Sequence, residues 1–270
     1  MPADSPARPI PSAPPLPGGN FSMDVVIPVL NEAHVLEKSV RKAHDFLSRE
    51  FSCRWRLIVA DNGSTDGTDE VARRMMQEFP EVALLQLSQR GRGRALRLAW
   101  SQSTADIVAY MDVDLSTELE ALPKLITAIR SQGYDVATGS RLHRLSHTTR
   151  GFKREFISRC YNLFIKAVLW TSFTDAQCGF KAVSRRAVEE LVPQIEDQAW
   201  FFDTELMVLA EKQGYRIFDQ PVTWVDDPDS RVRIMKTAWE DIKGVLRVRW
   251  KLWRNAITPV ARRSTAPSKL

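Results

Sequence analysis

Residues 105–116 read ADIVAYMDVDLS, an apolar run that ends in two carboxylates. Two earlier stretches have the same form, MDVVIPVLNE over 23–32 and RLIVADNGSTDGT over 56–68. Each joins the pattern of a buried β-strand to a polar loop, and helical patterns lie between them. Continuous apolar strands alternating with helices are typical of a mostly parallel central sheet flanked by helices. We therefore predict an α/β fold whose ligands bind at the carboxyl ends of the strands.

The same alternation continues on both sides of this stretch. Further strands are expected at 82–87 and 135–140, and helices near 118–132 and 152–170. Residues 1–21 contain seven of the 15 prolines and are expected to form a disordered tail. The predicted organisation is a disordered tail (1–21), a catalytic domain (22–235), a basic amphipathic helix (236–255) and a flexible basic tail (256–270).

Composition limits the class of protein. Hydrophobic residues make up 44% and charged residues 26%, which excludes a wholly disordered chain. No run approaches the length of apolar sequence that a membrane-spanning helix needs, and no signal peptide is apparent. Cys53, Cys160 and Cys178 are too few and too scattered for a disulfide framework, so a reduced, cytoplasmic chain is expected.

The charge is unevenly distributed along the chain. The net charge is +5, yet from Arg231 onward there are eleven basic and two acidic residues, so the remainder is mildly acidic. Such asymmetry indicates a polyanionic partner for the basic end, either an anionic membrane surface or a nucleic acid. No helix-turn-helix, zinc-finger or RNP pattern supports nucleic acid, and we expect no nucleic-acid partner.

Asp112 and Asp114 follow a buried strand directly, with Ser116 next in the same phase. Two neighbouring carboxylates repel each other, and a hard divalent cation together with substrate phosphates would relieve that repulsion. On its own the short motif is common, and a solvated turn is the alternative. Its context favours metal binding, because Glu32 and Asp61 also follow strands and would face the same crevice. Together these loops fit a nucleotide diphosphate held by Mg²⁺ or Mn²⁺.

At this point a family resemblance is visible. IPVLNE, IVADNGSTDGT and the DVD of YMDVDLST resemble the nucleotide-binding half of the inverting GT-A glycosyltransferases, and the likeness runs from about 23 to 235. The GSR of 139–141, DAQCGFK over 175–181 and WFFDTEL over 200–206 are similar to the dolichyl- and polyprenyl-phosphate sugar synthases. The resemblance implies the GT-A fold.

The resemblance also implies roles for individual residues. The acceptor phosphate would be held by Arg141, Arg154 and Ser158, and the metal by Asp112, Asp114 and Ser116. The implied catalytic set is Asp112, Asp114, Arg141 and Arg154. The implied donor-binding set is Pro28, Leu30, Glu32, Asp61, Asn62, Gly91, Arg92, Val113, Asp114 and Arg231.

The implied reaction transfers one hexose from a nucleotide diphosphate sugar to polyprenyl or dolichyl phosphate with inversion. DAQCGFK and WFFDTEL look like the dolichyl-phosphate glucosyltransferase branch, which favours UDP-glucose. Three positions depart from the family pattern. Asn62 stands where an Asp is usual, Ser116 where a Gln is common, and Leu30 where an aromatic residue is common. GDP-mannose and a UDP-N-acetylhexosamine therefore stay open as donors. Other candidate functions are a glycosyltransferase with a saccharide or protein acceptor, a nucleotidyltransferase, and a non-catalytic membrane-surface adaptor.

The region 236–254 predicts an interfacial helix. At helical spacing, one stripe is apolar, and it comprises Trp239, Ile242, Leu246, Trp250 and Trp253. One flank is basic, and it comprises Lys236, Lys243, Arg247, Lys251 and Arg254. Tryptophan beside Lys and Arg suits the surface of an anionic membrane, whereas an ordinary terminal helix packed on the sheet is the alternative. We expect peripheral association at the cytosolic face of a membrane, with a separate membrane protein as a candidate anchor.

Overall fold

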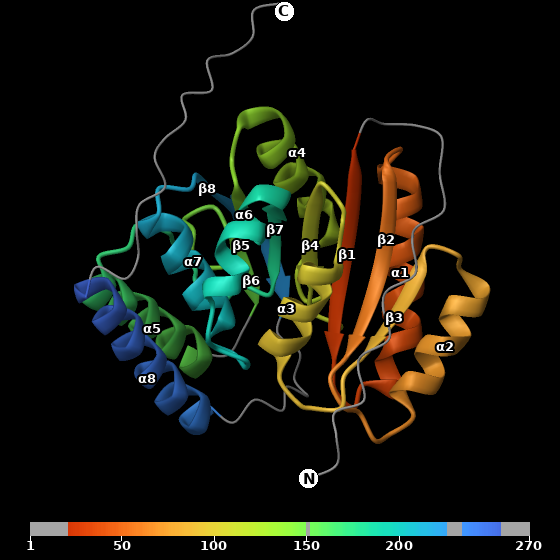
Figure 1. Ribbon diagram of the computed structural model, residues 1–270, viewed down its shortest axis with the longest axis horizontal. Helices are drawn as coiled ribbons and strands as arrows, with labels where there is room; N and C mark the ends of the chain where they lie inside the picture. Colours follow the sequence, from red (N-terminus) through yellow and green to blue (C-terminus); the bar gives the residue numbers. More distant parts are fainter. Residues whose placement is uncertain (1–20, 150–151, 226–233, 255–270) are drawn as a thin grey trace, which may run out of the picture.

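The strands predicted from the sequence all belong to one sheet in the computed structural model, which describes residues 21–149, 152–225 and 234–254 (Figure 1). Within that part of the chain, seven strands pair in the order β3-β2-β1-β4-β7-β5-β8. Their bounds are β1 (Ser22–Val29), β2 (Arg54–Asp61), β3 (Val82–Gln86), β4 (Ile107–Met111), β5 (Val136–Ser140), β7 (Phe180–Ser184) and β8 (Ile217–Pro221). Two short strands, β6 (His147–Thr149) and β9 (Thr223–Val225), pair separately. The predicted α/β fold is confirmed.

The helices connect these strands as the alternation predicts. They are α1 (Ala33–Glu50), α2 (Thr68–Glu78), α3 (Arg92–Gln102), α4 (Leu122–Gln132), α5 (Phe152–Leu169), α6 (Arg185–Leu191), α7 (Phe202–Lys212) and α8 (Ile234–Trp253). Two single 3₁₀ turns, η1 (Leu119–Ala121) and η2 (Val192–Gln194), adjoin α4 and α6. The predicted tails lie outside the described residues, except for Phe21.

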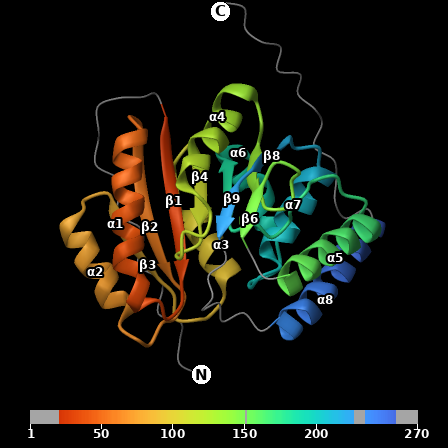
Figure 2. The ribbon, with the colours of Figure 1, turned by 180° about the vertical axis from the view of Figure 1, so that it is seen from behind.

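Helices cover both faces of the sheet because alternate strand residues point to opposite sides. On one face, Val25 and Ile27 of β1 pack with residues of α1, α2 and α4. On the other, Val26 of β1 and Ile58 of β2 pack with residues of α3, α6 and α7 (Figures 1 and 2). This two-sided burial explains why the strand segments read as continuous apolar runs.

One strand departs from the predicted parallel order. β7 lies between β4 and β5 and runs antiparallel to both, which makes β4 and β5 parallel to each other. Its five residues, FKAVS, pass straight into α6 without a crossover helix. The buried Lys181, its second residue, interrupts the apolar pattern that marks the other strands, so the sequence pattern does not reveal this strand.

The helices α5 and α8 lie side by side in both views, outside the layer of α7 (Figures 1 and 2). α8 contacts the body through buried Val245 and Val248, and Gly244 lets it approach closely. A Cβ at Gly244 would lie 2.5 Å from the ring of Phe201. None of the helices in the described ranges is long and apolar enough to cross a membrane.

Candidate active site

The loops that follow β1, β2, β4 and β5 meet at one edge of the sheet, because these strands are parallel. The register places Val29, the last residue of β1, beside Asp61, the last residue of β2. Directly after β4 and β5 come Asp112 and Arg141. Asp61, Asp112 and Arg141 therefore lie at strand ends that point to the same edge of the sheet, although β7 separates β4 from β5.

Asn62 connects three segments at this edge. Its Nδ2 donates to the carbonyl of Val29 at 2.7 Å, and its Oδ1 accepts from the backbone N–H of Gly91 at 3.2 Å. The neighbouring Asp61 is 3% exposed and accepts from the N–H of Ser64 at 3.0 Å. Both buried side chains thus fix the shape of the loops that would surround a nucleotide.

The first loop is held against the second by another asparagine. Asn31 has φ +58°, a left-handed conformation that Asn tolerates better than most residues. Its Oδ1 accepts from the N–H of Thr65 at 2.8 Å, and its own N–H donates to Ser64 Oγ at 2.9 Å. The N–H of Glu32 donates to Thr68 Oγ1 at 2.9 Å, which fixes the backbone beside this predicted donor ligand.

A tight turn presents the two carboxylates after β4. Leu115 has φ +50°, and the N–H of Ser116 donates to Asp114 Oδ1 at 3.0 Å. Asp114 is exposed, whereas Asp112 lies against Gly179. A Cβ at Gly179 would be 1.7 Å from Asp112 Oδ2, so only glycine leaves room for this carboxylate.

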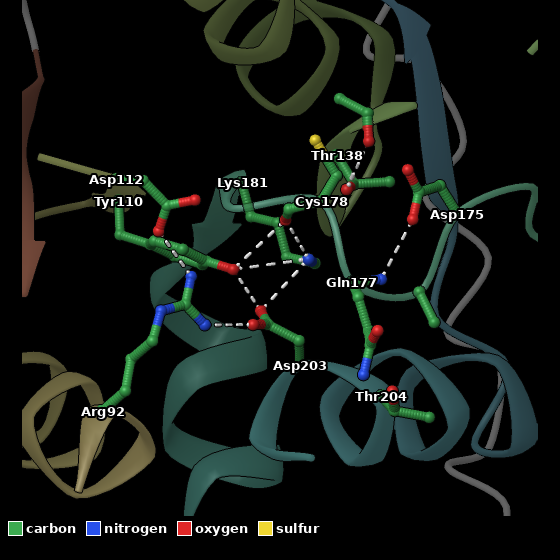
Figure 3. A network of polar contacts seen from close by, with 12 residues as sticks. Arg92, Tyr110, Asp112, Thr138, Asp175, Gln177, Cys178, Lys181, Asp203 and Thr204 are labelled. Atoms are coloured by element: carbon green, nitrogen blue, oxygen red, sulfur yellow. Dashed lines mark hydrogen bonds and ion pairs between the residues drawn. The ribbon is translucent and has the colours of Figure 1, made fainter. Parts of the chain in front are cut away.

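Behind Asp112 lies a buried network of alternating charge (Figure 3). Arg92 donates to Asp112 Oδ1 at 2.8 Å through one Nη and to Asp203 through the other. Asp203 also accepts from the hydroxyl of Tyr110, and its Oδ1 lies 3.1 Å from Lys181 Nζ. Arg92 thus links the carboxylate at the surface to a carboxylate that is almost wholly buried.

The buried cations determine the charge state of this network. Burial acts to raise the pKa of Asp203, but Lys181 and Arg92 outweigh it and hold the pKa below its ordinary value. Burial and the adjacent Asp203 raise the pKa of Tyr110 well above its ordinary value. Tyr110 is therefore a neutral hydrogen-bond donor, and Asp203 is an anion that balances the two cations.

Arg92 is thereby placed as a support for Asp112. The Arg92 side chain is only 10% exposed, and its guanidinium lies 5.0 Å and 5.1 Å from the ring centroids of Tyr110 and Trp200. The adjacent Gly91 is explained by packing, since a Cβ there would lie 2.4 Å from the carbonyl oxygen of Gln198. Direct contact of Gly91 or Arg92 with the donor stays a prediction.

Arg141 is held by a second buried carboxylate. Its Nε and Nη2 donate to the two oxygens of Asp175 at 2.7 and 2.9 Å, and its backbone N–H donates at 3.1 Å. Burial acts to raise the pKa of Asp175, but Arg141 outweighs it and lowers the pKa. Burial acts to lower the pKa of Arg141, but Asp175 outweighs it and raises the pKa, with a smaller contribution from Asp112. A fixed cation therefore lies near the carboxylates of β4.

The other predicted site residues are described to different extents. Pro28 is buried in β1, whereas Leu30 and Val113 are half-buried at the strand ends. Ser158 is on α5, where its carbonyl accepts from Asn162. The predicted contacts of Arg154 and Arg231 lie outside what the structure describes. Arg154 belongs to α5, but its side chain is not described, and Arg231 falls between the described ranges, in 226–233.

Sequence reasoning assigned no role to several residues that the structure brings together. Tyr110, Lys181 and Asp203 form the network behind Asp112, and Asp175 holds Arg141. The available signal was the family resemblance, because the two segments quoted for it, 175–181 and 200–206, contain Asp175, Lys181 and Asp203. A lysine and an acid within apolar segments predict a buried ion pair, but only the fold shows which cation meets which acid.

The donor set suits a hard divalent cation. Mg²⁺ is commonly held by one or two carboxylates together with substrate phosphates and water. Asp114 is exposed, Asp112 is 41% exposed at its side chain, and glycine at 179 keeps space beside Asp112. The described residues contain no group of three or more His, Cys, Asp or Glu that could hold a metal by itself. The two carboxylates therefore fit a cation that a bound diphosphate helps to coordinate.

Comparison with known proteins gives the family. The model of glycosyl transferase family 2 matches residues 24–192. Glycosyltransferase AglD of Haloferax volcanii is 36% identical over 232 residues, which cover 85% of this chain and 37% of that protein. The dolichyl-phosphate beta-glucosyltransferase of Saccharomyces cerevisiae is 27% identical, over 78% of this chain and 69% of that protein. The predicted resemblance is confirmed, although this chain spans little more than a third of AglD.

Solved structures agree with the fold. Glucosyl-3-phosphoglycerate synthase from Mycobacterium tuberculosis in complex with UDP gives a TM-score of 0.67 at 20% identity, covering 86% of this chain and 81% of that one. The same synthase with Mn²⁺, UDP and phosphoglyceric acid gives 0.66 at 17% identity, covering 85% and 78%. The sheet and its helices thus have the predicted GT-A architecture.

Proposed function

The chain belongs to glycosyl transferase family 2, and from this premise we propose that it transfers one glucose from UDP-glucose to dolichyl or polyprenyl phosphate with inversion. The observation that carries the proposal is the juxtaposition of two charged groups at one sheet edge. Asp112 and Asp114 end β4, while Arg141, held by Asp175, ends the parallel strand β5. The names of the relatives support glucose and a dolichyl-phosphate acceptor.

The donor half would comprise the loops after β1, β2 and β4. Asp61 and Glu32 would accept from the base or ribose, and Asn62 holds the loops after β1 and β2 in position. Asp112 and Asp114, with Ser116, would hold Mg²⁺ or Mn²⁺. The chemistry that such a cation supplies when bound is neutralisation of the diphosphate charge.

The acceptor half would be organised around Arg141. Nε and Nη2 donate to Asp175, and the remaining nitrogen, Nη1, would donate to a phosphate oxygen. A guanidinium fixed in this way loses little conformational entropy when it binds a phosphate. Arg154 and Ser158 of α5 are proposed as further phosphate ligands.

The reaction itself needs positioning more than proton transfer. An oxygen of the acceptor phosphate attacks the anomeric carbon while the bond from that carbon to the diphosphate oxygen breaks, and the electron pair leaves with UDP. Because the acceptor is already an anion, no strong general base is required. The chain's own contribution is alignment by Arg141 and electrostatic stabilisation around the departing diphosphate.

We place this reaction at the cytosolic face of a membrane, with the chain bound peripherally. Eight large apolar side chains are exposed on α5, on α8 and directly after α5, namely Phe156, Ile157, Leu163, Trp170, Trp239, Leu246, Trp250 and Trp253. We call this set the aromatic face. Lys243, Arg249 and Arg254 lie over the rings of Trp239, Trp170 and Trp250, respectively. Exposed tryptophan beside basic residues favours an anionic lipid surface.

The basic flank predicted for α8 is partly wrong. Arg247 and Lys251 turn inward, where Arg247 donates to buried Glu205 at 2.7 Å and Lys251 pairs with Glu196. Spacing along one helix does not show which side packs on the protein. The cations that stay beside the aromatic face are those stacked on its rings, and an anchoring membrane protein is not needed to explain that face.

The reaction can be tested with a panel of donors. We would incubate the protein with Mn²⁺ and a short polyprenyl phosphate, with UDP-glucose, GDP-mannose or a UDP-N-acetylhexosamine in parallel, and weigh the lipid by mass spectrometry. We expect a gain of one hexose from UDP-glucose alone. Pyrophosphate release would indicate a nucleotidyltransferase. Transfer only to saccharide or protein hydroxyls would indicate a glycosyltransferase with a different acceptor. Absence of nucleotide binding would favour the adaptor.

A further inference from the structure

The segment that holds Arg141 is itself held by the two outer helices. Between α5 and β7, Asp175 binds the Arg141 guanidinium, and the next two residues contact the outer layer. The N–H of Ala176 donates to Asn162 Oδ1 on α5 at 3.2 Å. The side chain of Gln177 donates from Nε2 to Asp241 Oδ2 on α8 at 2.7 Å. We refer to residues 175–178 as the clamp loop.

The contact between Gln177 and Asp241 continues to Arg141 through hydrogen bonds. The backbone N–H of Gln177 donates to Asp175 Oδ1 at 3.1 Å (Figure 3). The same oxygen accepts from Arg141 Nη2 at 2.9 Å. Gln177 therefore binds Asp175 with its backbone and Asp241 with its side chain. A rotation of Gln177 would disturb the orientation of the carboxylate that fixes Arg141.

Asp241 is an unusual residue for the buried side of α8. It is 3% exposed, and Val245 and Val248 on the same side of the helix are fully buried. Burial raises its pKa to about 6, so at neutral pH an ionised carboxylate is kept in a site that disfavours the charge. An apolar residue would pack there at lower cost. This cost is consistent with a role other than packing.

We infer that Asp241 and Gln177 are positioning residues for Arg141: α8 fixes the clamp loop through them and thereby places the guanidinium for the acceptor phosphate. The inference rests on the proposed function, which assigns Arg141 to that phosphate. The outer side of α8 carries the aromatic face, and its inner side carries Asp241. α8 would thus contact the membrane with its outer side and, through the clamp loop, fix Arg141, which binds the lipid phosphate.

Steady-state kinetics with four variants test this inference. Gln177→Ala and Asp241→Ala should each raise the KM for a short polyprenyl phosphate about tenfold, as expected when a positioning contact is lost. The KM for UDP-glucose should stay unchanged, because the donor loops do not contact the clamp loop through these residues. Asp241→Asn keeps an oxygen that can accept from Gln177, so this variant should keep the wild-type KM for the acceptor. Glu240→Ala, at the exposed neighbouring position, is the matched control.

A double variant separates positioning from general damage. If the two residues act through their shared hydrogen bond, Gln177→Ala/Asp241→Ala should be no worse than either single variant. Additive losses, an equal rise in the donor KM, or an unchanged acceptor KM in Asp241→Ala would each overturn the inference.

Amide hydrogen exchange provides a test that does not depend on activity. Exchange in peptides covering 172–180 should become faster in Asp241→Ala and Gln177→Ala, stay at the wild-type rate in Asp241→Asn, and remain unchanged over β1 and β2 in all three. Unaltered exchange at 172–180 would overturn the inference even in an active enzyme. If the wild type transferred no sugar to a lipid phosphate, the proposed function would fail, and this measurement would still decide whether α8 fixes the clamp loop.

Discussion

At the scale of single residues, the buried carboxylates differ in what surrounds them. Arg141 lowers the pKa of Asp175 despite its burial, and Lys181 and Arg92 do the same for Asp203. Around Asp241, burial and the neighbouring Asp197 and Glu240 raise the pKa, and hydrogen bonds from Gln177 and Tyr161 only partly oppose them. The first two carboxylates are therefore anions that balance cations, whereas Asp241 is an acid with a pKa of about 6.

This difference predicts a pH-dependent gain in stability for Asp241→Asn. The folded protein keeps the Asp241 proton up to a pH of about 6, whereas the unfolded chain loses it near 3.8, so the free energy of unfolding falls as pH rises through that window. Asparagine removes the charge and should raise the free energy of unfolding by about 1–3 kcal/mol at pH 7.5. At pH 4 the same substitution should change the free energy of unfolding only slightly.

Urea unfolding at both pH values checks this prediction. Asp45→Asn, on the exposed side of α1, is the control because it removes the same charge from a position that is 77% exposed. An equal effect of Asp241→Asn at both pH values, or destabilisation at pH 7.5, would contradict the account of Asp241 as a buried, ionised acid.

At the scale of elements, α8 has two distinct sides. One carries Gly244, Val245 and Val248 against the body, while Trp250 and Trp253 are 53% and 76% exposed on the other. An ordinary terminal helix packed on the sheet would bury its aromatic stripe, so the structure leaves this stripe available for another surface. Contact of this stripe with a membrane stays a prediction.

Vesicle binding follows from these two sides. Replacing Lys243 and Arg254 by Gln should weaken binding to vesicles of mixed neutral and anionic lipid by about fivefold per residue, from about 1 kcal/mol each. Trp250→Ser/Trp253→Ser should weaken binding to neutral and anionic vesicles alike. Sedimentation with the vesicles measures both effects.

The control for this experiment lies on a distant helix. Lys38→Gln/Lys42→Gln on α1 removes the same charge from exposed positions and should leave vesicle binding nearly unchanged. Binding that falls equally in both pairs would show that only net charge matters. Self-association of the wild type, abolished by the tryptophan changes, would indicate that a second copy covers the aromatic face.

The elements also show how far sequence patterns reach. β1, β2 and β4 are predictable because both of their faces are covered, which produces long apolar runs with abrupt polar ends. β7 is not predictable in this way, since it contains Lys181, whose charge is paired in the interior with Asp203 of α7. Local pattern identifies the strands that are apolar throughout and misses the strand whose burial depends on an ion pair.

At the scale of the whole molecule, the fold brings Asp61, Asp112, Asp114 and Arg141 to one edge of the sheet. Position after a strand predicts this for Asp61, Asp112 and Arg141, since parallel strands end together. It does not predict that Asp175 and Arg92 hold those side chains, because such contacts join segments far apart in the chain. The candidate ligands were thus accessible from sequence, and their supports were not.

The most direct test of the account is the rate of glucose transfer from UDP-glucose to a short polyprenyl phosphate in wild type and Asp114→Ala. Asp114 is exposed, so its replacement should leave the fold intact. We expect the wild type to add one hexose to the lipid only with Mg²⁺ or Mn²⁺, and Asp114→Ala to be slower by about a hundredfold or more. Full activity of Asp114→Ala, or wild-type transfer that persists in EDTA, would contradict the account.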